Sequence, residues 1–111
     1  MAGWYELTKN AKGQVSFVLK AGNAEVILRS EQYESRASAD NGIASVQKNS
    51  PMEERYDRLV AKDGRPYFNL KAGNHQIIGT SQMYAAESGR DNGIKSVQTN
   101  GPSTIVKDLT A

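Results

Sequence analysis

The stretch Asp40-Asn41-Gly42-Ile43-Ala44-Ser45-Val46-Gln47 returns 51 positions later as Asp91-Asn92-Gly93-Ile94-Lys95-Ser96-Val97-Gln98. The same shift carries the run Lys20-Ala21-Gly22-Asn23 onto Lys71-Ala72-Gly73-Asn74. Between positions 5 and 51, 20 of 47 residues are identical to their partners without a gap, so the chain is an internal duplication. A repeat of this kind is one supersecondary unit that cannot bury its apolar face alone. We therefore expect the two halves to share one hydrophobic core.

The length of 111 residues is that of a single domain, with a first repeat over about 4–54 and a second over about 55–109. The composition is that of a globular protein, with 38% hydrophobic and 23% charged residues. The formal net charge is only +2, which is too small a surplus to predict a nucleic-acid-binding surface. The absence of cysteine excludes disulfides, thiol catalysis and zinc–thiolate sites.

The first residues show no basic start followed by an apolar run, so we expect no signal peptide. No apolar stretch approaches the length that crosses a membrane. A cytoplasmic protein without a membrane partner is the expectation.

Each half is predicted to form three short strands and then a helix. The alternation of apolar and polar residues predicts strands at 4–9, 15–20 and 25–30, and again at 56–60, 67–71 and 76–80. Helical spacing then begins after Ser35 and runs to about Asn49, with a counterpart that ends at Asn100. Residues 103–109 are a predicted last strand, and their counterpart, Met52–Arg55, is expected to continue into Tyr56 without a break.

Strand alternation also separates two faces of the predicted sheet. The face under the helices carries the shared pairs Tyr5/Tyr56, Phe17/Phe68, Leu19/Leu70 and Ile27/Ile78. The other face is chemically mixed and carries, among others, Trp4, Val18, Leu28, Tyr67 and Lys71. An antiparallel sheet can leave one face to water. Gly42 and Gly93, beside the apolar stripe of each helix, predict a close approach of helix and sheet.

The hairpin Lys-Ala-Gly-Asn and the helical motif Asn-Gly-Ile-x-Ser-Val-Gln, each present twice, resemble the YegP-like family of small bacterial proteins of unknown function. The resemblance covers nearly the whole chain, from Trp4 to about Leu109. It implies an α+β fold in which two β-β-β-α-β repeats form one mostly antiparallel sheet. Two helices would pack on one face, with the final strands exchanged between the repeats. The family supplies no catalytic residues.

The motifs that suggest chemistry are weak. His75, the single histidine, follows a turn, and an exposed residue without a role is the favoured interpretation. Ser45 and Lys48 have the spacing of a serine–lysine nucleophile, but the second repeat has Thr99 in place of the lysine. Asp40-Asn41-Gly42 resembles a fragment of a calcium loop whose glutamate is missing. We therefore expect no metal, no cofactor and no enzymatic activity.

The polar residues that both repeats share are candidates for binding. The favoured interpretation is structural, because duplicated units retain what the fold needs. If a binding site exists, two equivalent places are predicted, one around Lys20, Tyr33 and Asn41 and the other around Lys71, Tyr84 and Asn92. Tyr67 belongs to the mixed sheet face and completes the candidates.

The leading functional hypothesis is a protein or peptide interaction module that uses the open sheet face, because that face combines aromatic, aliphatic and basic side chains. Binding of single-stranded nucleic acid is an alternative, since bases can stack on aromatic residues of a sheet. An enzyme that acts on a small molecule is the third alternative, and it would need a convergent polar pocket. The duplication further predicts a monomer with an internal pseudo-twofold axis.

Overall fold

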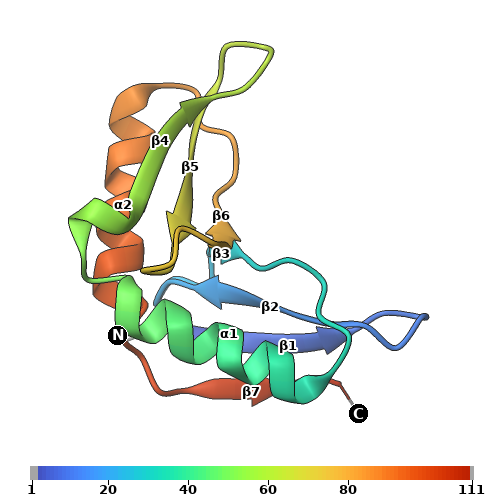
Figure 1. Cartoon of the computed structure of the whole chain (residues 1–111). Coiled ribbons are helices and arrows are strands. Elements are labelled where there is room, and N and C mark those ends of the chain that lie inside the picture. Colours follow the sequence, from blue (N-terminus) through green and yellow to red (C-terminus); the bar gives the residue numbers. More distant parts are fainter. Residues whose placement is uncertain (1–2, 111) are drawn as a thin grey trace.

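The computed structural model describes residues 3–110 and joins both repeats in one sheet with two helices on one face (Figure 1). The elements of the first repeat are β1 Trp4–Lys9, β2 Val15–Lys20, β3 Val26–Arg29 and α1 Arg36–Asn49. The second repeat contributes β4 Tyr56–Val60, β5 Pro66–Lys71, β6 Ile77–Thr80, α2 Glu87–Asn100 and the final strand β7 Val106–Asp108. The predicted order of strands and helices is confirmed, and the third strands are slightly shorter than expected.

The seven strands lie in the order β4-β5-β6-β3-β2-β1-β7, so the repeats meet where β3 pairs with β6. Neighbouring strands are antiparallel except β7, which runs parallel to β1 with Val106 opposite Tyr5. The Tyr5 backbone N–H donates to the carbonyl of Ile105 over 2.9 Å. The end of the second repeat therefore completes the sheet of the first, which confirms the exchange of the last strand.

The segment before β4 departs from the prediction. Glu53–Arg55 form the 3-10 turn η1 rather than a strand, and the Tyr56 N–H bonds to the Glu53 carbonyl before β4 begins. The 51-residue shift aligns 55–57 with β7, so the strand that follows α1 is the start of β4 itself. The preceding residues form the connection from the helix end to the sheet edge, and a single turn shortens that path.

Two tyrosines tie each repeat to the helix of the other. The Tyr5 hydroxyl of β1 donates to the Gly101 carbonyl at the end of α2 over 2.6 Å. The Tyr56 hydroxyl of β4 donates to the Ser50 carbonyl at the end of α1 over 2.7 Å. Carbonyls at a helix end lack intrahelical partners, and these phenols supply them. Burial raises the pKa of both tyrosines, so both phenols remain donors at neutral pH.

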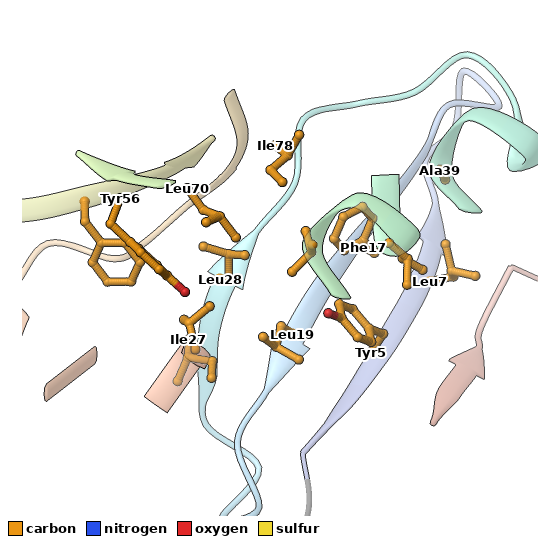
Figure 2. Close-up of a cluster of buried hydrophobic side chains, with 14 of the residues drawn as sticks. Tyr5, Leu7, Phe17, Leu19, Ile27, Leu28, Ala39, Tyr56, Leu70 and Ile78 are labelled. Carbon is orange, nitrogen blue, oxygen red and sulfur yellow. The ribbon is translucent and has the colours of Figure 1, made fainter. Parts of the chain in front are cut away.

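The core is one continuous cluster with side chains from both repeats (Figure 2). Its fully buried members include Tyr5, Phe17, Leu19, Val46, Phe68, Leu70, Ile94 and Val97. The face predicted to lie under the helices is therefore confirmed. Neither repeat encloses these residues alone, because each helix packs on strands from both halves of the sheet.

Leu28 belongs to this core and not to the open face, where strand alternation had placed it. Its side chain is 1% exposed, and it pairs with Leu19 across β2 and β3. The ladder shifts register between Leu19 and Lys20, so the extra residue Ile27 opposes no single partner. A bulge of this kind turns two consecutive side chains toward one face. The regular alternation of side chains between the two faces of the sheet is therefore interrupted in β3.

Gly42 in α1 and its counterpart Gly93 in α2 each make room for a tyrosine from the preceding loop. A Cβ added at Gly42 would lie 2.5 Å from the Tyr33 hydroxyl and 3.0 Å from the Phe17 ring. Tyr33 stacks on Phe17 with ring centroids 6.1 Å apart, and Tyr84 stacks on Phe68 in the same way. The predicted close approach at the helical glycine is confirmed, and the tyrosine side chain is part of its cause.

Candidate functional site

A row of side chains crosses all seven strands on the sheet face opposite the helices, which we call the open face. Strand pairing sets these side chains next to one another in the order Lys107, Glu6, Val18, Arg29, Thr80, Asn69 and Asp57. Directly paired residues of neighbouring strands project to the same side of a sheet. The repeats thus present one continuous surface, with Arg29 and Thr80 at its centre.

The charges toward the two ends of the open face are paired. Lys20 lies 3.3 Å from Glu6 in the first repeat, and Lys71 lies 2.5 Å from Asp57 in the second. The Trp4 indole N–H donates to Glu6 over 2.8 Å, and Lys107 lies 4.3 Å from the centre of the Trp4 ring. The hydrogen bond from Trp4 lowers the pKa of Glu6, so this carboxylate is ionised at neutral pH.

The centre of the open face contains a hollow. β3 and β6 share one residue pair there, Arg29 opposite Thr80. The hollow has a volume of about 180 Å³, and its lining includes Arg29, Ile77 and Thr80. Ile77 is 45% exposed and projects to the same side as Lys71, its partner on β5. Within residues 3–110, no carboxylate oxygen lies within 4.0 Å of the Arg29 guanidinium.

Three of the candidate residues from the sequence lie on the open face, namely Lys20, Tyr67 and Lys71. Tyr67 is opposite Leu59 on β4, and both side chains are half-buried. The open face is therefore apolar around Tyr67, next to the β4 edge of the sheet. It is charged around Lys20 and Lys71.

The other candidates lie on the helix side of the sheet. Tyr33 and Tyr84 are half-buried against the core, and burial raises the pKa of both phenols. Asn41 and Asn92 are exposed on α1 and α2. The two predicted groups are therefore not assembled, because the sheet separates each lysine from its tyrosine and asparagine.

Asn41 borders a groove between α1 and the turn that joins β5 to β6. The groove has a volume of about 400 Å³, and its lining also includes Lys48, Asn49, Arg55, Gly73 and Asn74. Arg55 Nε donates to Asn49 Oδ1 over 3.0 Å, while Asn49 Nδ2 donates to the Ser45 carbonyl over 2.8 Å. Both repeats form the walls of this groove, which we call the α1 groove.

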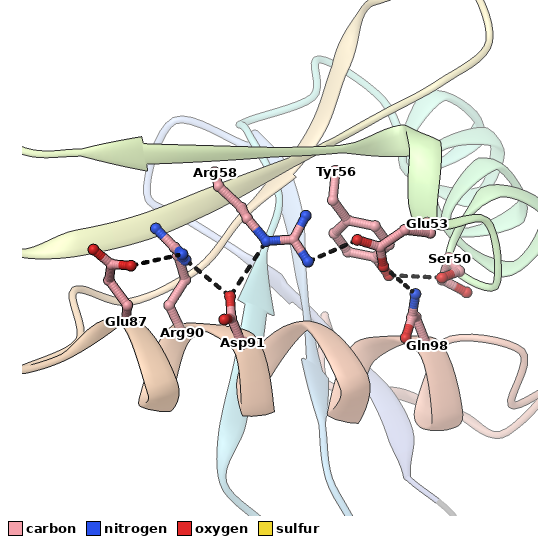
Figure 3. Close-up of polar contacts among 8 residues, drawn as sticks. All are labelled: Ser50, Glu53, Tyr56, Arg58, Glu87, Arg90, Asp91 and Gln98. Atoms are coloured by element: carbon pink, nitrogen blue, oxygen red, sulfur yellow. Dashed lines mark hydrogen bonds and ion pairs between the residues drawn. The ribbon is translucent and has the colours of Figure 1, made fainter.

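A network of charges connects β4 to α2 (Figure 3). Arg58 lies 2.7 Å from Glu53 and 3.3 Å from Asp91, and Arg90 lies 3.2 Å from the same aspartate. Gln98 donates a further hydrogen bond to Glu53 over 3.0 Å. Arg90 is 7% exposed, so its charge requires these carboxylates as partners.

The first repeat has an apolar packing at the corresponding positions. Leu7 and Ala39, which align with Arg58 and Arg90, are both fully buried. Strand β7 covers Leu7, and the Leu109 N–H donates to its carbonyl over 2.8 Å. No strand of the described chain covers β4 in this way. Arg58 therefore forms ion pairs at the sheet edge, at the position where the first repeat has a buried leucine beside an additional strand.

In residues 3–110, no three histidine, aspartate or glutamate side chains are close enough to share a metal ion. No helix in this range is long and apolar enough to cross a membrane. His75 is exposed in the β5–β6 turn with a φ of 69°, the same value as its counterpart Ala24.

Comparison with known proteins identifies the family. The family described as "Domain of unknown function (DUF1508)" matches the chain twice, over residues 10–57 and 61–108. A UPF0339 protein of Acinetobacter baylyi is 64% identical over 110 residues, which are 99% of both chains. The UPF0339 protein YegP of Escherichia coli K12 is 61% identical over 110 residues, 99% of this chain and 100% of YegP. The chain belongs to the UPF0339 family.

Two solved UPF0339 structures have the same fold. The solution structure of a UPF0339 protein from Shewanella oneidensis matches with a TM-score of 0.93 at 64% identity, covering 99% of this chain and 93% of that one. The solution structure of yegP from Escherichia coli, described as a protein of unknown function, matches with a TM-score of 0.94 at 60% identity. That comparison covers 100% of this chain and 96% of yegP.

The sequence patterns do not indicate two concave features of this UPF0339 chain, the hollow at Arg29 and the α1 groove. Arg29 was not a candidate, although the β3–β6 pairing places it at the centre of the open face. The sequence does not single out Arg55 either, and it marks Lys48 only through its spacing from Ser45. No local pattern reveals these sites, because the partners of each basic residue come from the other repeat.

Proposed function

We propose that this chain is a non-enzymatic binding module that recognises a protein or peptide through the open face of its sheet. The observation that supports this most is the hollow of about 180 Å³ at the centre of that face, with Arg29 and Ile77 in its lining. Binding hot spots gather near the centre of an interface, in pockets that lose their water, and arginine is enriched among them. A surface with a central arginine beside an exposed aliphatic side chain has this arrangement.

The size of the hollow favours a protein side chain over a small molecule. Pockets for small molecules hold roughly 300–1,000 Å³, and the hollow is smaller than this range. One side chain of a partner would fill it. The lining of the hollow also includes Glu31, but among the described residues no carboxylate oxygen lies within 4.0 Å of the Arg29 guanidinium, which leaves it available to a carboxylate of the partner. An acidic or polar side chain next to an aliphatic one is the ligand that this surface suits.

The alternative of single-stranded nucleic acid has weaker support from the geometry. Trp4 is the largest aromatic side chain on the open face, but Lys107 lies over its ring and Glu6 accepts its indole N–H. A base that stacked on Trp4 would have to displace Lys107. Lys20 and Lys71 are also paired with carboxylates, which reduces the positive field available for phosphates.

An enzymatic function also has weaker support. Ser45 accepts a hydrogen bond from Asn49 over 3.3 Å, and no base approaches its hydroxyl among the hydrogen bonds of the described residues. A serine nucleophile needs an adjacent general base.

Peptide selection tests the proposal directly. The immobilised chain would be used to select binders from a random peptide library, and the affinity of a selected peptide would be measured for two variants. Arg29→Glu reverses the central charge and is expected to weaken binding about tenfold or more. The double variant Tyr67→Ala, Lys71→Glu should weaken it as well, because it changes the same face.

Lys95→Glu provides the matched control, since it makes the same change of charge at an exposed position on α2. We expect it to leave the affinity within about twofold of the wild type, as for a charge outside an interface. Equal losses for Arg29→Glu and Lys95→Glu would contradict the role of the open face. Preferential selection of oligonucleotides over peptides at low salt would favour the alternative.

A further inference from the structure

Two basic residues that have no acidic partner within residues 3–110 line the α1 groove. Lys48 lies in the last turn of α1, and Arg55 lies at the end of η1, just before β4. The lining contains no acidic residue. We propose that the α1 groove binds a small molecule through its phosphate group. This site lies on the helix side of the sheet and does not depend on the function proposed for the open face.

The guanidinium of Arg55 is held in place with its outer nitrogens free. Its Nε donates to Asn49 Oδ1 over 3.0 Å, and Asn49 is 5% exposed and fixed by two hydrogen bonds to Ser45. Among the hydrogen bonds of residues 3–110, none uses the two terminal nitrogens of Arg55. These nitrogens form the fork that binds two oxygens of a phosphate.

Gly73 keeps one of these terminal nitrogens accessible. A Cβ added at this position would contact Arg55 Nη2 at 3.4 Å, so a larger side chain would cover the donor. Gly73 also allows the backbone of the β5–β6 turn to approach a ligand closely. The turn and the arginine therefore border the same part of the groove.

The charge balance of the groove favours an anion. No carboxylate of the described chain lies within 4.0 Å of the charged nitrogens of Lys48 and Arg55. The C-terminus of α1 opposes an anion with roughly half a negative charge, whereas the two side chains contribute two full positive charges. A phosphate monoester carries about −1.5 to −2 at neutral pH and neutralises both, which a single carboxylate does not.

The volume of the groove indicates a ligand larger than phosphate itself. About 400 Å³ falls in the range of small-molecule pockets, roughly 300–1,000 Å³. Ala44 and Ala72 add apolar surface to the lining, and Asn41 adds an exposed amide. A phosphate joined to a compact polar or cyclic group suits this combination.

Comparison with the second repeat indicates that Arg55 does more than hold the asparagine at the helix end. Its helix ends on the corresponding Asn100, which bonds to Ser96 as Asn49 does to Ser45. The acceptor Asn100 Oδ1 is occupied by the backbone N–H of Gly3 over 2.9 Å. A main-chain donor is therefore enough to hold this asparagine, so an arginine is not needed for that purpose. The second repeat also lacks the lysine, since Thr99 occupies the position of Lys48. The pair of basic residues Lys48 and Arg55 is therefore specific to the α1 groove and is not repeated at the end of α2.

An NMR titration of the full chain tests the proposal. The 15N-labelled protein would be titrated at constant ionic strength with inorganic phosphate, ribose 5-phosphate and ribose. We expect saturable shifts of the amides of Gly73 and Asn74 and of the Arg55 Nε–H with both phosphate probes. Ribose should cause none. Tighter binding of ribose 5-phosphate than of inorganic phosphate would show that the groove takes the whole molecule.

Three variants test the position of the site and the geometry of its arginine. Lys48→Thr introduces the residue of the second repeat at an exposed position and should weaken binding of ribose 5-phosphate about tenfold, the value of one charged hydrogen bond. Lys95→Ala removes the same charge from α2, where the first repeat has Ala44, and should change the affinity less than about twofold. Arg55→Lys keeps the charge but loses the fork, and should bind more weakly than the wild type.

The proposal fails if the shifts do not saturate or if they spread over basic residues on all sides of the molecule. Equal losses for Lys48→Thr and Lys95→Ala would also overturn it, because they would show general attraction to a basic surface. Thermal unfolding of each variant separates loss of binding from loss of folding. Lys48 is exposed, so Lys48→Thr decides the question even if Arg55→Lys is unstable.

Discussion

Leu28 and Gly79 show how single residues break the symmetry of the repeat. They occupy equivalent positions near the pseudo-twofold axis, and a Cβ at Gly79 would lie 2.5 Å from Leu28 Cδ2. We expect Gly79→Ala to lower the free energy of unfolding by about 1–3 kcal/mol, since it overpacks a buried contact. Leu28→Ala should lower it by about 2–5 kcal/mol through a cavity. Urea unfolding of both variants measures these values.

The double variant decides whether the two residues act as a pair. The alanine at position 28 makes room for the one at position 79, so the combined loss should be smaller than the sum of the single losses by about 0.5 kcal/mol or more. Strictly additive losses would show that Gly79 is not there to accommodate Leu28.

The helices differ in how their N-termini are capped. The Ser35 hydroxyl accepts a hydrogen bond from the Ser38 N–H over 3.1 Å, whereas Ala86 before α2 offers no such acceptor. The backbone angles of the two residues are nearly equal, φ −143° and −148° with ψ 160° in both. Ala86→Ser should therefore raise the free energy of unfolding by about 1 kcal/mol, and Ser35→Ala should lower it similarly. Chemical denaturation measures both.

Ala85→Ser is the control for this prediction, because it adds the same hydroxyl one residue before the cap. It should leave stability within about 0.5 kcal/mol, as surface substitutions usually do. An equal gain for Ala85→Ser and Ala86→Ser would contradict the assignment of the cap.

The carboxylate of Asp108 links strand β7 to Arg36 of helix α1, which makes this element sensitive to acid. Hydrogen bonds from the Thr110 side chain and backbone and from Arg36 lower the pKa of Asp108 from 3.8 to about 2. A carboxylate with a lowered folded-state pKa stabilises the fold above its unfolded value, and this contribution disappears as the pH falls from about 4 to about 2. We expect protection of the Leu109 amide, which bonds to the Leu7 carbonyl, to decrease in that window.

Hydrogen exchange of Leu109 measures this effect, with the β2 amides paired to β1 as the internal reference. In Asp108→Asn the additional loss of protection between pH 4 and pH 2 should be absent. The same acid dependence in both proteins would exclude Asp108 as its source.

At the scale of the whole molecule, neither repeat has a complete interior. Tyr5 bonds to the end of α2, Tyr56 bonds to the end of α1, and β7 of the second repeat completes the sheet on β1. We expect fragments 1–51 and 52–111, expressed separately, to lack cooperative unfolding as monomers, because each exposes half of a shared core. Circular dichroism melts combined with measurement of molecular mass test this.

A monomeric fragment that melts sharply with dispersed NMR signals would contradict the shared core. Recovery of the native spectrum on mixing the two fragments would support it. The intact chain should be a monomer, because its repeats already satisfy each other.

The residue patterns were sufficient for most of the fold. Alternation and the period of 51 residues located the strands and both helices, because local preferences agree with the final structure at these places. They failed at Leu28, where a bulge changes the register, and at Glu53–Arg55, where a short connection needs a turn. Both failures arise from pairing between segments that are distant in the chain, which a local pattern does not contain.

The candidate sites were less accessible to sequence reasoning. Lys20, Tyr67 and Lys71 were correctly assigned to one face of the sheet, since parity along a strand is local. Grouping Lys20 with Tyr33 and Asn41 was wrong, because the sheet lies between them. The hollow at Arg29 and the groove at Arg55 exist only where the two repeats meet.

Patterns along the chain were enough to identify the duplicated unit, its family and the apolar face of both helices and of most strands, β3 being the exception. These follow from chemistry that repeats along the chain within a few residues. Where the surface is concave, and which basic residues of the described range have no acidic partner, became apparent only in the folded chain. The physical reason is that pairing, packing and neutralisation of charge act between residues close in space, and here most of those neighbours come from opposite repeats.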